Sequence, residues 1–237
     1  MRAVIVANGP MPKLPFPRLV VGEKDLVVCV DGGAKNALAL GLKPRLVMGD
    51  MDSMEAVLRE HLQEEGCEFS EHPSRKDETD SELAVRYVLS QGASELILLA
   101  ALGGRIDHTL ANVMLLAIPE LEGVKARLLD GNQEVLLCRG EIQIEGQPGD
   151  TVSLLPLSGD VTGVCTKGLE YALRHGTLKF GAARGVSNVL TAPQARVCVG
   201  SGLLLVVHLH QQCPAEDSDG GWSGRHNGEL RGDPSLR

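Results

Sequence analysis

The sequence predicts an N-terminal α/β domain built on a parallel sheet, followed by a C-terminal all-β sandwich. Two observations lead to this prediction. Short apolar runs alternate with segments of helical periodicity through the first half of the chain. Closely spaced strand patterns, without a long amphipathic helix, fill the second half from about Gly123. We therefore expect domains at residues 1–122 and 123–210, and a disordered, polar and glycine-rich tail at 211–237.

In the first half, five apolar runs have the length and flanking residues of strands. Three segments between them have apolar residues on one helical face, and Pro119 ends the last of these helices. Alternating strands and helices imply a parallel, Rossmann-like sheet with right-handed crossovers. The predicted strands are 3–7, 26–30, 46–48, 67–69 and 96–101, and the predicted helical faces are Met54, Val57, Leu58, His61 and Leu62, then Leu83, Ala84, Tyr87 and Val88, then Leu110, Val113, Met114 and Ala117.

In the second half, strand-like segments follow one another at short intervals. Gly, Pro, Ser and Asp separate them, which is typical of a compact sandwich or barrel. The predicted strands are 126–129, 134–138, 142–144, 151–155, 161–166, 177–180, 196–199 and 203–210.

Composition excludes several classes of protein. The net charge of −8 and the aromatic content of 3% argue against a nucleic-acid-binding protein. No apolar stretch approaches the roughly 20 residues that a membrane span needs. The apolar run at the N-terminus is too short for the hydrophobic region of a signal peptide. The 6 cysteines are scattered singly, which disfavours disulfides or a zinc site. We expect a cytoplasmic enzyme or binding protein.

Acidic loops follow several of the predicted strands. Asp31 stands after the second strand, and Asp50 and Asp52 after the third, while Asp77 and Asp107 lie in two further loops. In a parallel sheet, these loops leave one carboxyl edge, where open α/β folds bind ligands. Clustered carboxylates need a cation, and hard oxygen ligands favour Mg²⁺. Neighbouring glycines let backbone N–H groups approach phosphate oxygens. The pattern predicts a metal–phosphate site.

Some of these residues also have a structural explanation. Asp52 with Glu55, and Thr79 with Glu82, have the spacing of helix capping boxes. For Asp52, capping and metal binding are both open, whereas Asp50 and Asp77 fit no capping position.

Basic residues next to the acids could contact phosphate. Lys76 could neutralise charge on a transferring phosphoryl group, although it could also belong to a solvated charge run. Arg105 could clamp phosphate through two hydrogen bonds. Asp107 could be a ligand or the N-cap of a helix starting at Thr109, and His108 fits a surface or capping residue better than a base. The sequence contains no P-loop, which argues against a standard triphosphate cradle. No G-x-G-x-x-G follows the first strand, which argues against a nicotinamide or flavin site.

At the level of whole motifs, the chain resembles the thiamine pyrophosphokinase family over roughly residues 3 to 210. The resemblance rests on four segments in the right order: 50–53, 76–82, 103–112, and 168–188 with its Ser187-Asn188 pair. It implies an α/β nucleotide-binding domain, a β-sandwich, and a homodimer with sites at the interface. It also implies transfer of a pyrophosphoryl group from ATP to thiamine, giving thiamine diphosphate and AMP.

The resemblance also implies roles for individual residues. Tyr171 could stack on the thiazolium ring by a cation–π contact, or could equally be an aromatic residue of the β core. The expected roles are catalysis by Asp50, Asp52, Asp77 and Asp107; Mg²⁺ binding by Asp50, Asp52 and Asp77; ATP binding by Asp31, Lys76, Thr79, Asp80, Arg105 and His108; and thiamine binding by Tyr171, Ser187 and Asn188.

Two questions stay open at this point. An aspartate could accept the proton of the attacking alcohol, and we rank Asp77 above Asp107 for this role. The same site would also suit a Mg²⁺-dependent nucleotide phosphohydrolase, or a non-catalytic sensor of nucleotide and thiamine.

Overall fold

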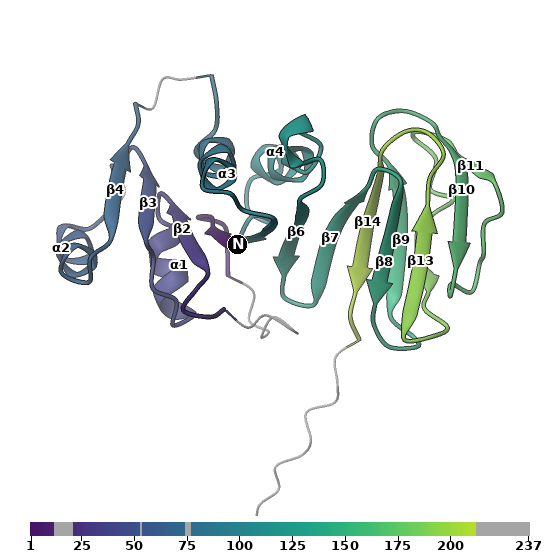
Figure 1. Cartoon of the computed structure of the whole chain (residues 1–237), viewed down its shortest axis with the longest axis horizontal. Helices are drawn as coiled ribbons and strands as arrows, with labels where there is room; N and C mark the ends of the chain where they lie inside the picture. Colours follow the sequence, from purple (N-terminus) through teal and green to yellow (C-terminus); the bar gives the residue numbers. More distant parts are fainter. Residues whose placement is uncertain (12–20, 53, 74–76, 212–237) are drawn as a thin grey trace, which may run out of the picture.

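The computed structural model of the chain describes residues 1–11, 21–52, 54–73 and 77–211. A 10-stranded mixed sheet runs through the molecule in the order β12-β9-β14-β7-β6-β5-β1-β2-β3-β4, and a 4-stranded sheet of order β11-β10-β13-β8 makes a second β layer at one end of it (Figure 1). Within the described residues, no helix is long and apolar enough to cross a membrane. Lys76 and the tail from residue 212 lie outside these residues.

The first part of the large sheet is parallel, as predicted. Its strands are β1 (Arg2–Val6), β2 (Leu26–Val30), β3 (Leu46–Gly49), β4 (Glu68–Glu71), β5 (Glu95–Leu99) and β6 (Lys125–Asp130). β1, β2 and β5 are almost wholly buried because helices cover both faces, which explains their continuous apolar sequences.

The strand β6 differs from the prediction. We had assigned its residues to the all-β region, but β6 pairs in parallel with β5, with Leu96 opposite Ala126. The helix after β5 returns the chain to the end of the sheet where β5 began, so the next strand, β6, runs parallel to β5. The sheet becomes antiparallel only where β6 pairs with β7. The domain boundary at residue 122 stays a prediction.

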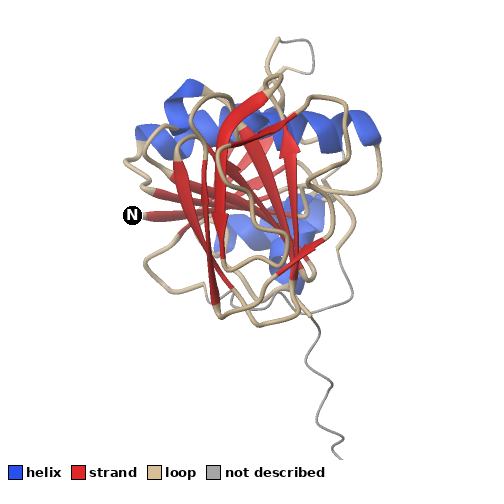
Figure 2. Cartoon of the chain, turned by 90° about the vertical axis from the view of Figure 1, so that its right-hand side faces the viewer, coloured by secondary structure: helices blue, strands red, loops and turns tan. Residues whose placement is uncertain are grey.

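Helices cover the two faces of the parallel strands (Figures 1 and 2). One buried cluster contains Ala34, Ala37 and Leu62 with Val4 and Val6, and the other contains residues of the later helices with Ala3 and Ile5. The first pair of helices, α1 (Gly33–Ala39) and α2 (Ala56–Glu64), thus lies opposite the second pair, α3 (Asp80–Ser90) and α4 (Ile106–Leu115), which a 3₁₀ turn, η1 (Pro119–Leu121), follows.

The predicted helical faces hold only in part. Ala84 and Val88 are buried as expected, but Leu110 and Met114 of α4 are exposed. The short helix α1 was not predicted, because a single turn or two of small residues carries little periodic signal. In α4, Asn112 and Leu115 are buried, and Val113 of the predicted face is partly buried against the core.

The second half forms the predicted all-β region. Its strands are β7 (Gln133–Cys138), β8 (Glu141–Glu145), β9 (Thr151–Pro156), β10 (Val161–Lys167), β11 (Gly176–Leu178), β12 (Asn188–Val189), β13 (Gln194–Cys198) and β14 (Leu204–Leu209). A buried cluster that includes Ile144, Leu154, Val164 and Leu204 draws on strands of both sheets and forms the sandwich core. The two-residue strand β12 was not predicted.

The order of the parallel strands positions the site. From β1, the chain adds β2, β3 and β4 on one side, and then adds β5 and β6 on the other side. The loops that leave the carboxyl ends of β1 and β5 therefore run in opposite directions, and a crevice opens between them.

We predict that Ile5→Ala lowers the free energy of unfolding by about 2–5 kcal/mol, because it leaves a cavity in a core cluster where Ile5 is fully buried. Urea unfolding would measure this loss. The control Val57→Ala removes an exposed side chain of α2 and should change stability by less than about 0.5 kcal/mol. Equal losses in the two variants would contradict the assigned core.

Candidate active site

A pocket of about 620 Å³ opens at the carboxyl ends of β1, β2 and β5. It is lined by the loop after β1, the end of β2, the start of α3 and the loop that leads from β5 into α4. Of the residues predicted from the sequence, the pocket brings together Asp31, Thr79, Asp80, Arg105, Asp107 and His108. Its lining, within the described part of the chain, does not include Asp50, Asp52 or Asp77.

Asp31 links the pocket to the loop that carries Asp50. Its backbone N–H donates to the carbonyl of Met48 at 2.9 Å, and its φ of 49° turns the chain at the end of β2. A Cβ atom on Gly49 would lie 1.7 Å from Asp31 Oδ1, so only glycine allows the carboxylate to lie this close to β3. Asp50 follows directly after Gly49, which places its loop beside Asp31.

Asp50 and Asp52 share one tight turn. The Oδ1 atom of Asp50 accepts the backbone N–H of Asp52 at 3.2 Å. Asp50 is half-buried and Asp52 is exposed. The predicted capping box at Asp52 is wrong, because α2 begins at Ala56 and its N-cap residue is Glu55. The carboxylate of Glu55 accepts a hydrogen bond from Lys35 Nζ at 2.7 Å instead.

Thr79 begins α3 as predicted. Its Oγ1 atom accepts the backbone N–H of Glu82 at 3.2 Å, so half of the predicted capping box is confirmed. The carboxylate of Glu82 accepts from Arg86 instead, at 3.0 Å. Asp80 lies in the first turn of α3, and the exposed Asp77 lies just before the helix. The N-terminus of α3 therefore lies at the pocket, where its first-turn N–H groups favour binding of an anion.

Arg105 and Asp107 form a bidentate ion pair at the start of α4. Arg105 Nη2 lies 2.5 Å from Asp107 Oδ2, and Arg105 Nε donates to Oδ1 at 3.1 Å. This interaction lowers the pKa of Asp107 to about 2. The N-cap role considered for Asp107 is wrong, because α4 begins at Ile106 and Arg105 is its N-cap residue. His108 lines the pocket as an exposed side chain.

The pocket also contains residues that the sequence analysis missed. Asn8 and Gly9 enter from the loop after β1, and Asn112 enters from α4. Asn112 Nδ2 donates to the carbonyl of Ala101 at 2.8 Å, which holds α4 against the end of β5. The turn-forming Asn8-Gly9-Pro10 sequence after the first strand was the available signal, but it lacks the acid that marked the other loops.

The residues predicted to face thiamine lie in the sandwich. The side chain of Tyr171 is 66% exposed, so the alternative of a β-core aromatic is wrong. Asn188 is buried: its Oδ1 accepts the backbone N–H of Tyr171 at 3.0 Å, and its Nδ2 donates to the carbonyl of Tyr171 at 2.9 Å. Ser187 has an exposed side chain and a φ of 60°, and its N–H donates to Ser153 Oγ at 3.0 Å.

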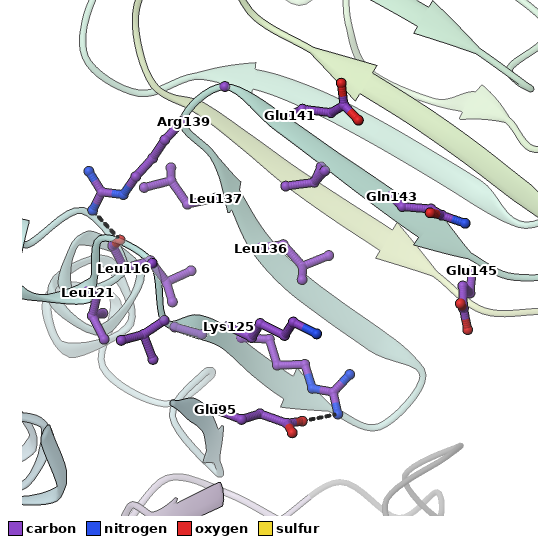
Figure 3. Close-up of a pocket in the computed structure, with 16 residues that line it drawn as sticks. Glu95, Leu116, Leu121, Lys125, Leu136, Leu137, Arg139, Glu141, Gln143 and Glu145 are labelled. Atoms are coloured by element: carbon purple, nitrogen blue, oxygen red, sulfur yellow. Dashed lines mark hydrogen bonds and ion pairs between the residues drawn. The ribbon is translucent and has the colours of Figure 1, made fainter. Parts of the chain in front are cut away.

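A second cavity, of about 780 Å³, lies where the α/β part meets the sandwich (Figure 3). Arg139 lies at one edge of it and donates to the carbonyls of Leu116 and Ile118 at 3.1 and 2.9 Å. Arg127 also lines this cavity and forms an ion pair with Glu95 at 3.3 Å. This cavity contains none of the site residues predicted from the sequence, so the pocket at the end of β1, β2 and β5 is the candidate active site.

We predict that Thr79→Ala destabilises the protein by about 0.5–2 kcal/mol, because it removes the oxygen that caps α3. Thr79→Ser keeps that oxygen and should stay within about 0.5 kcal/mol of the native stability. Urea unfolding would compare the two variants. Indistinguishable stabilities of the alanine and serine variants would show that the cap contributes nothing.

Comparison with known proteins relates both halves of the chain to one family. The family model described as thiamin pyrophosphokinase, catalytic domain, matches residues 18–128, and the model described as thiamin pyrophosphokinase, vitamin B1 binding domain, matches residues 140–204. A thiamine pyrophosphokinase of Bacillus subtilis is 27% identical over 205 residues, which are 86% of this chain and 96% of that protein. Thiamine pyrophosphokinase 1 of Oryza sativa subsp. japonica is 26% identical and covers 87% of each chain.

Solved structures agree as well. The crystal structure of thiamine pyrophosphokinase from Bacillus subtilis superposes with a TM-score of 0.80 at 25% identity, covering 90% of this chain and 100% of that one. The enzyme from Candida albicans, at 17% identity, shares the fold with a TM-score of 0.75 and covers 89% of each chain. Because the two family models together span most of the sequence, the chain belongs to the thiamine pyrophosphokinase family.

Proposed function

We propose that this protein transfers a pyrophosphoryl group from ATP to the hydroxyl of thiamine, with Mg²⁺, and releases thiamine diphosphate and AMP. By its family, the chain is a thiamine diphosphokinase, an ATP-dependent transferase of thiamine diphosphate biosynthesis. The observation that carries the proposal is the convergence of the Asp31, Thr79 and Arg105 loops on one pocket. The reversal of strand order at β1 and β5 supports a Rossmann-like description of the parallel region.

The pocket suits the polyphosphate of ATP. The N-terminus of α3 with Thr79 offers N–H groups to an anion, and Arg105 adds an exposed guanidinium. We assign ATP binding to Asp31, Thr79, Asp80, Arg105 and His108, and also to Lys76, which lies outside the described residues.

The donor set next to this pocket fits Mg²⁺. Asp50 and Asp52 offer hard carboxylate oxygens from one turn, and Asp77 offers another before α3. When bound, Mg²⁺ would neutralise phosphate charge and orient the transferred group. Without such a cation, the carboxylates that line and flank the pocket would repel ATP.

In the reaction, the thiamine oxygen bonds to the β-phosphorus of ATP, and the bond from that phosphorus to the α,β-bridging oxygen breaks, so that AMP leaves. The hydroxyl proton must go to a base. Asp107 is a poor acceptor because Arg105 lowers its pKa to about 2. We therefore assign the proton to Asp77, and we assign to Arg105 the stabilisation of negative charge on the phosphates.

Thiamine binding is assigned to the surface around Tyr171. The exposed ring of Tyr171 is available to stack on a cationic heterocycle. Ser187, the residue before Asn188, has an exposed side chain and offers a hydroxyl. The amide of Asn188 is used by the backbone of Tyr171 and Val189, so we propose that Asn188 acts by positioning Tyr171.

Strand order supports a homodimer with shared sites. β12, which carries Asn188, is six strands away from β1 in the large sheet, or roughly 25–30 Å at the usual strand spacing. The ATP pocket and the Tyr171 surface of one chain therefore cannot readily hold both substrates together. Next to the pocket, α4 exposes an apolar stripe of Ile106, Leu110 and Met114, each at least half exposed, which suits burial against a second copy.

A cytoplasmic location and the absence of nucleic-acid partners stay predictions. The free cysteines are consistent with a reducing compartment. Burial raises the pKa of Cys67 and Cys138 to about 11, so these thiols are unreactive core residues.

We predict that Asp50→Asn and Asp77→Asn each lower kcat by about 100- to 1000-fold while folding stays intact, because each variant loses a carboxylate that would hold Mg²⁺. Wild-type protein incubated with ATP, Mg²⁺ and thiamine should form thiamine diphosphate and AMP together. The control Glu64→Gln, at the end of α2, should keep full activity.

Three outcomes would contradict this function. Wild-type-like turnover by both aspartate variants would overturn the metal assignment. Release of AMP or ADP without thiamine would indicate a phosphohydrolase, and binding of both substrates without product would indicate a sensor.

A second prediction tests the shared site by complementation. Tyr171→Ala should raise the KM for thiamine, whereas Tyr171→Phe, which keeps the ring, should not. Asp77→Asn and Tyr171→Ala subunits, co-expressed with different tags, should recover roughly one quarter of the native activity at low thiamine, because half of the random dimers contain one intact site. If both substrates bound within one chain, the mixture would stay as inactive as its components.

A further inference from the structure

Four ionisable side chains meet at the end of the sandwich where β14 leaves the sheet, away from the proposed active site. Glu134 comes from β7, His208 from β14, His210 from just beyond β14, and Asp150 from the residue before β9. In the antiparallel register, His208 lies opposite Glu134, and His210 follows on the same side of the strand. His208 and Asp150 are buried, and the side chains of Glu134 and His210 are only 13% and 11% exposed.

The hydrogen bonds assign the tautomer of His208. Its Nε2 lies 2.9 Å from Asp150 Oδ2, which also accepts the N–H of Gln147 at 2.9 Å, while Asp150 Oδ1 accepts the N–H of Gln211 at 2.8 Å. Both oxygens of the Asp150 carboxylate thus already accept hydrogen bonds from backbone N–H groups. The carboxylate can therefore only accept, so Nε2 of His208 carries the proton and Nδ1 presents a lone pair in the neutral ring.

That Nδ1 atom is buried and has no hydrogen-bond partner among the described residues. It points to Glu134 Oε2, which is 3.8 Å away, and His210 Nε2 lies 3.6 Å from the same oxygen. The other oxygen of Glu134, Oε1, accepts from Arg127 Nη1 at 3.1 Å. Three possible ligand atoms thus lie close together in a largely buried region, and a cation between them would compensate the burial of their lone pairs.

We propose that Glu134 Oε2, His208 Nδ1 and His210 Nε2 bind one transition-metal ion of the Zn²⁺ class. The three ligand atoms all lie within 4.8 Å of one another. Tetrahedral Zn²⁺ places its ligands about 3.3 Å apart, so the ligand atoms would approach one another by a few tenths of an ångström up to about 1.5 Å. Two imidazole nitrogens favour Zn²⁺ over the Mg²⁺ that serves ATP.

The surroundings have the features of a metal site. Asp150 holds the proton on His208 Nε2, which orients the ring and makes Nδ1 a stronger ligand. Arg127 fixes Glu134 and also contacts Glu95 of β5 at 3.3 Å. An ion here would join β7 to the end of β14 and, through Arg127, to the parallel strands. Its role is therefore structural, and it is separate from phosphate transfer.

The experiment is titration of the full-length, metal-free protein with Zn²⁺ in excess Mg²⁺ and with thiols kept reduced, followed by calorimetry. The wild type should bind one tight equivalent, and Zn²⁺ should raise its Tm. His210→Ala should lose that equivalent and the shift in Tm, and Asp150→Asn should weaken binding by about 10- to 100-fold. The matched control His61→Ala, an exposed histidine of α2, should bind as the wild type does.

Co²⁺ substitution identifies the ligands. A tetrahedral cobalt spectrum without a thiolate charge-transfer band, lost in His210→Ala, is the expected result. Absence of a saturable equivalent, equal loss in His61→Ala, or a thiolate band would each overturn the site. Because His210 lies at the rim of the cluster, its variant should fold even where substitution of the fully buried His208 does not. Unchanged Zn²⁺ affinity in a folded His210→Ala variant would also overturn the proposal.

Discussion

The parallel pairing of β1 with both β2 and β5 is the interaction on which the rest of the structure depends. It places β1 at the centre of the parallel strands, buried under helices on both faces, and it reverses the direction in which strands are added. The crevice at that reversal receives the loops that carry Asp31, Thr79 and Arg105. A site of this kind needs no single catalytic motif, because the strand order assembles it from segments far apart in the sequence.

The large sheet also joins the two halves of the protein mechanically. Its hydrogen bonds continue from the parallel strands through β6 and β7 into the sandwich, so the halves share one sheet. Arg127 and Arg139 reinforce this junction with contacts to Glu95, Glu134 and the carbonyls after α4. The proposed ATP pocket and the Tyr171 surface are thereby connected by one continuous sheet, but they lie far apart on it. In the proposed dimer, a second copy would bring these two surfaces together.

The charges of the molecule follow from the same arrangement. Carboxylates collect at the carboxyl edge of the parallel strands, where a divalent cation and a polyphosphate can balance one another. The sandwich has its own collection of carboxylates and histidines around β14, where the local balance comes from Arg127, from Asp150 and from the proposed metal ion. The two proposed cation sites would then differ in both ligands and role: oxygen ligands would hold the catalytic Mg²⁺, and two imidazole nitrogens would help to hold a stabilising metal ion.

The sequence by itself determined most of the strands, the change from alternating helices and strands to strands alone, and the acid-bearing loops, because burial on two faces and alternation of helix and strand leave local periodic patterns. The tertiary structure alone decided that β6 belongs to the parallel strands, that Tyr171 is exposed and that Asn188 is buried beneath it. It alone brought Glu134 and His208 together, 74 positions apart in the chain. Pairing between distant strands and the choice of a buried face depend on non-local contacts, which no short stretch of sequence encodes.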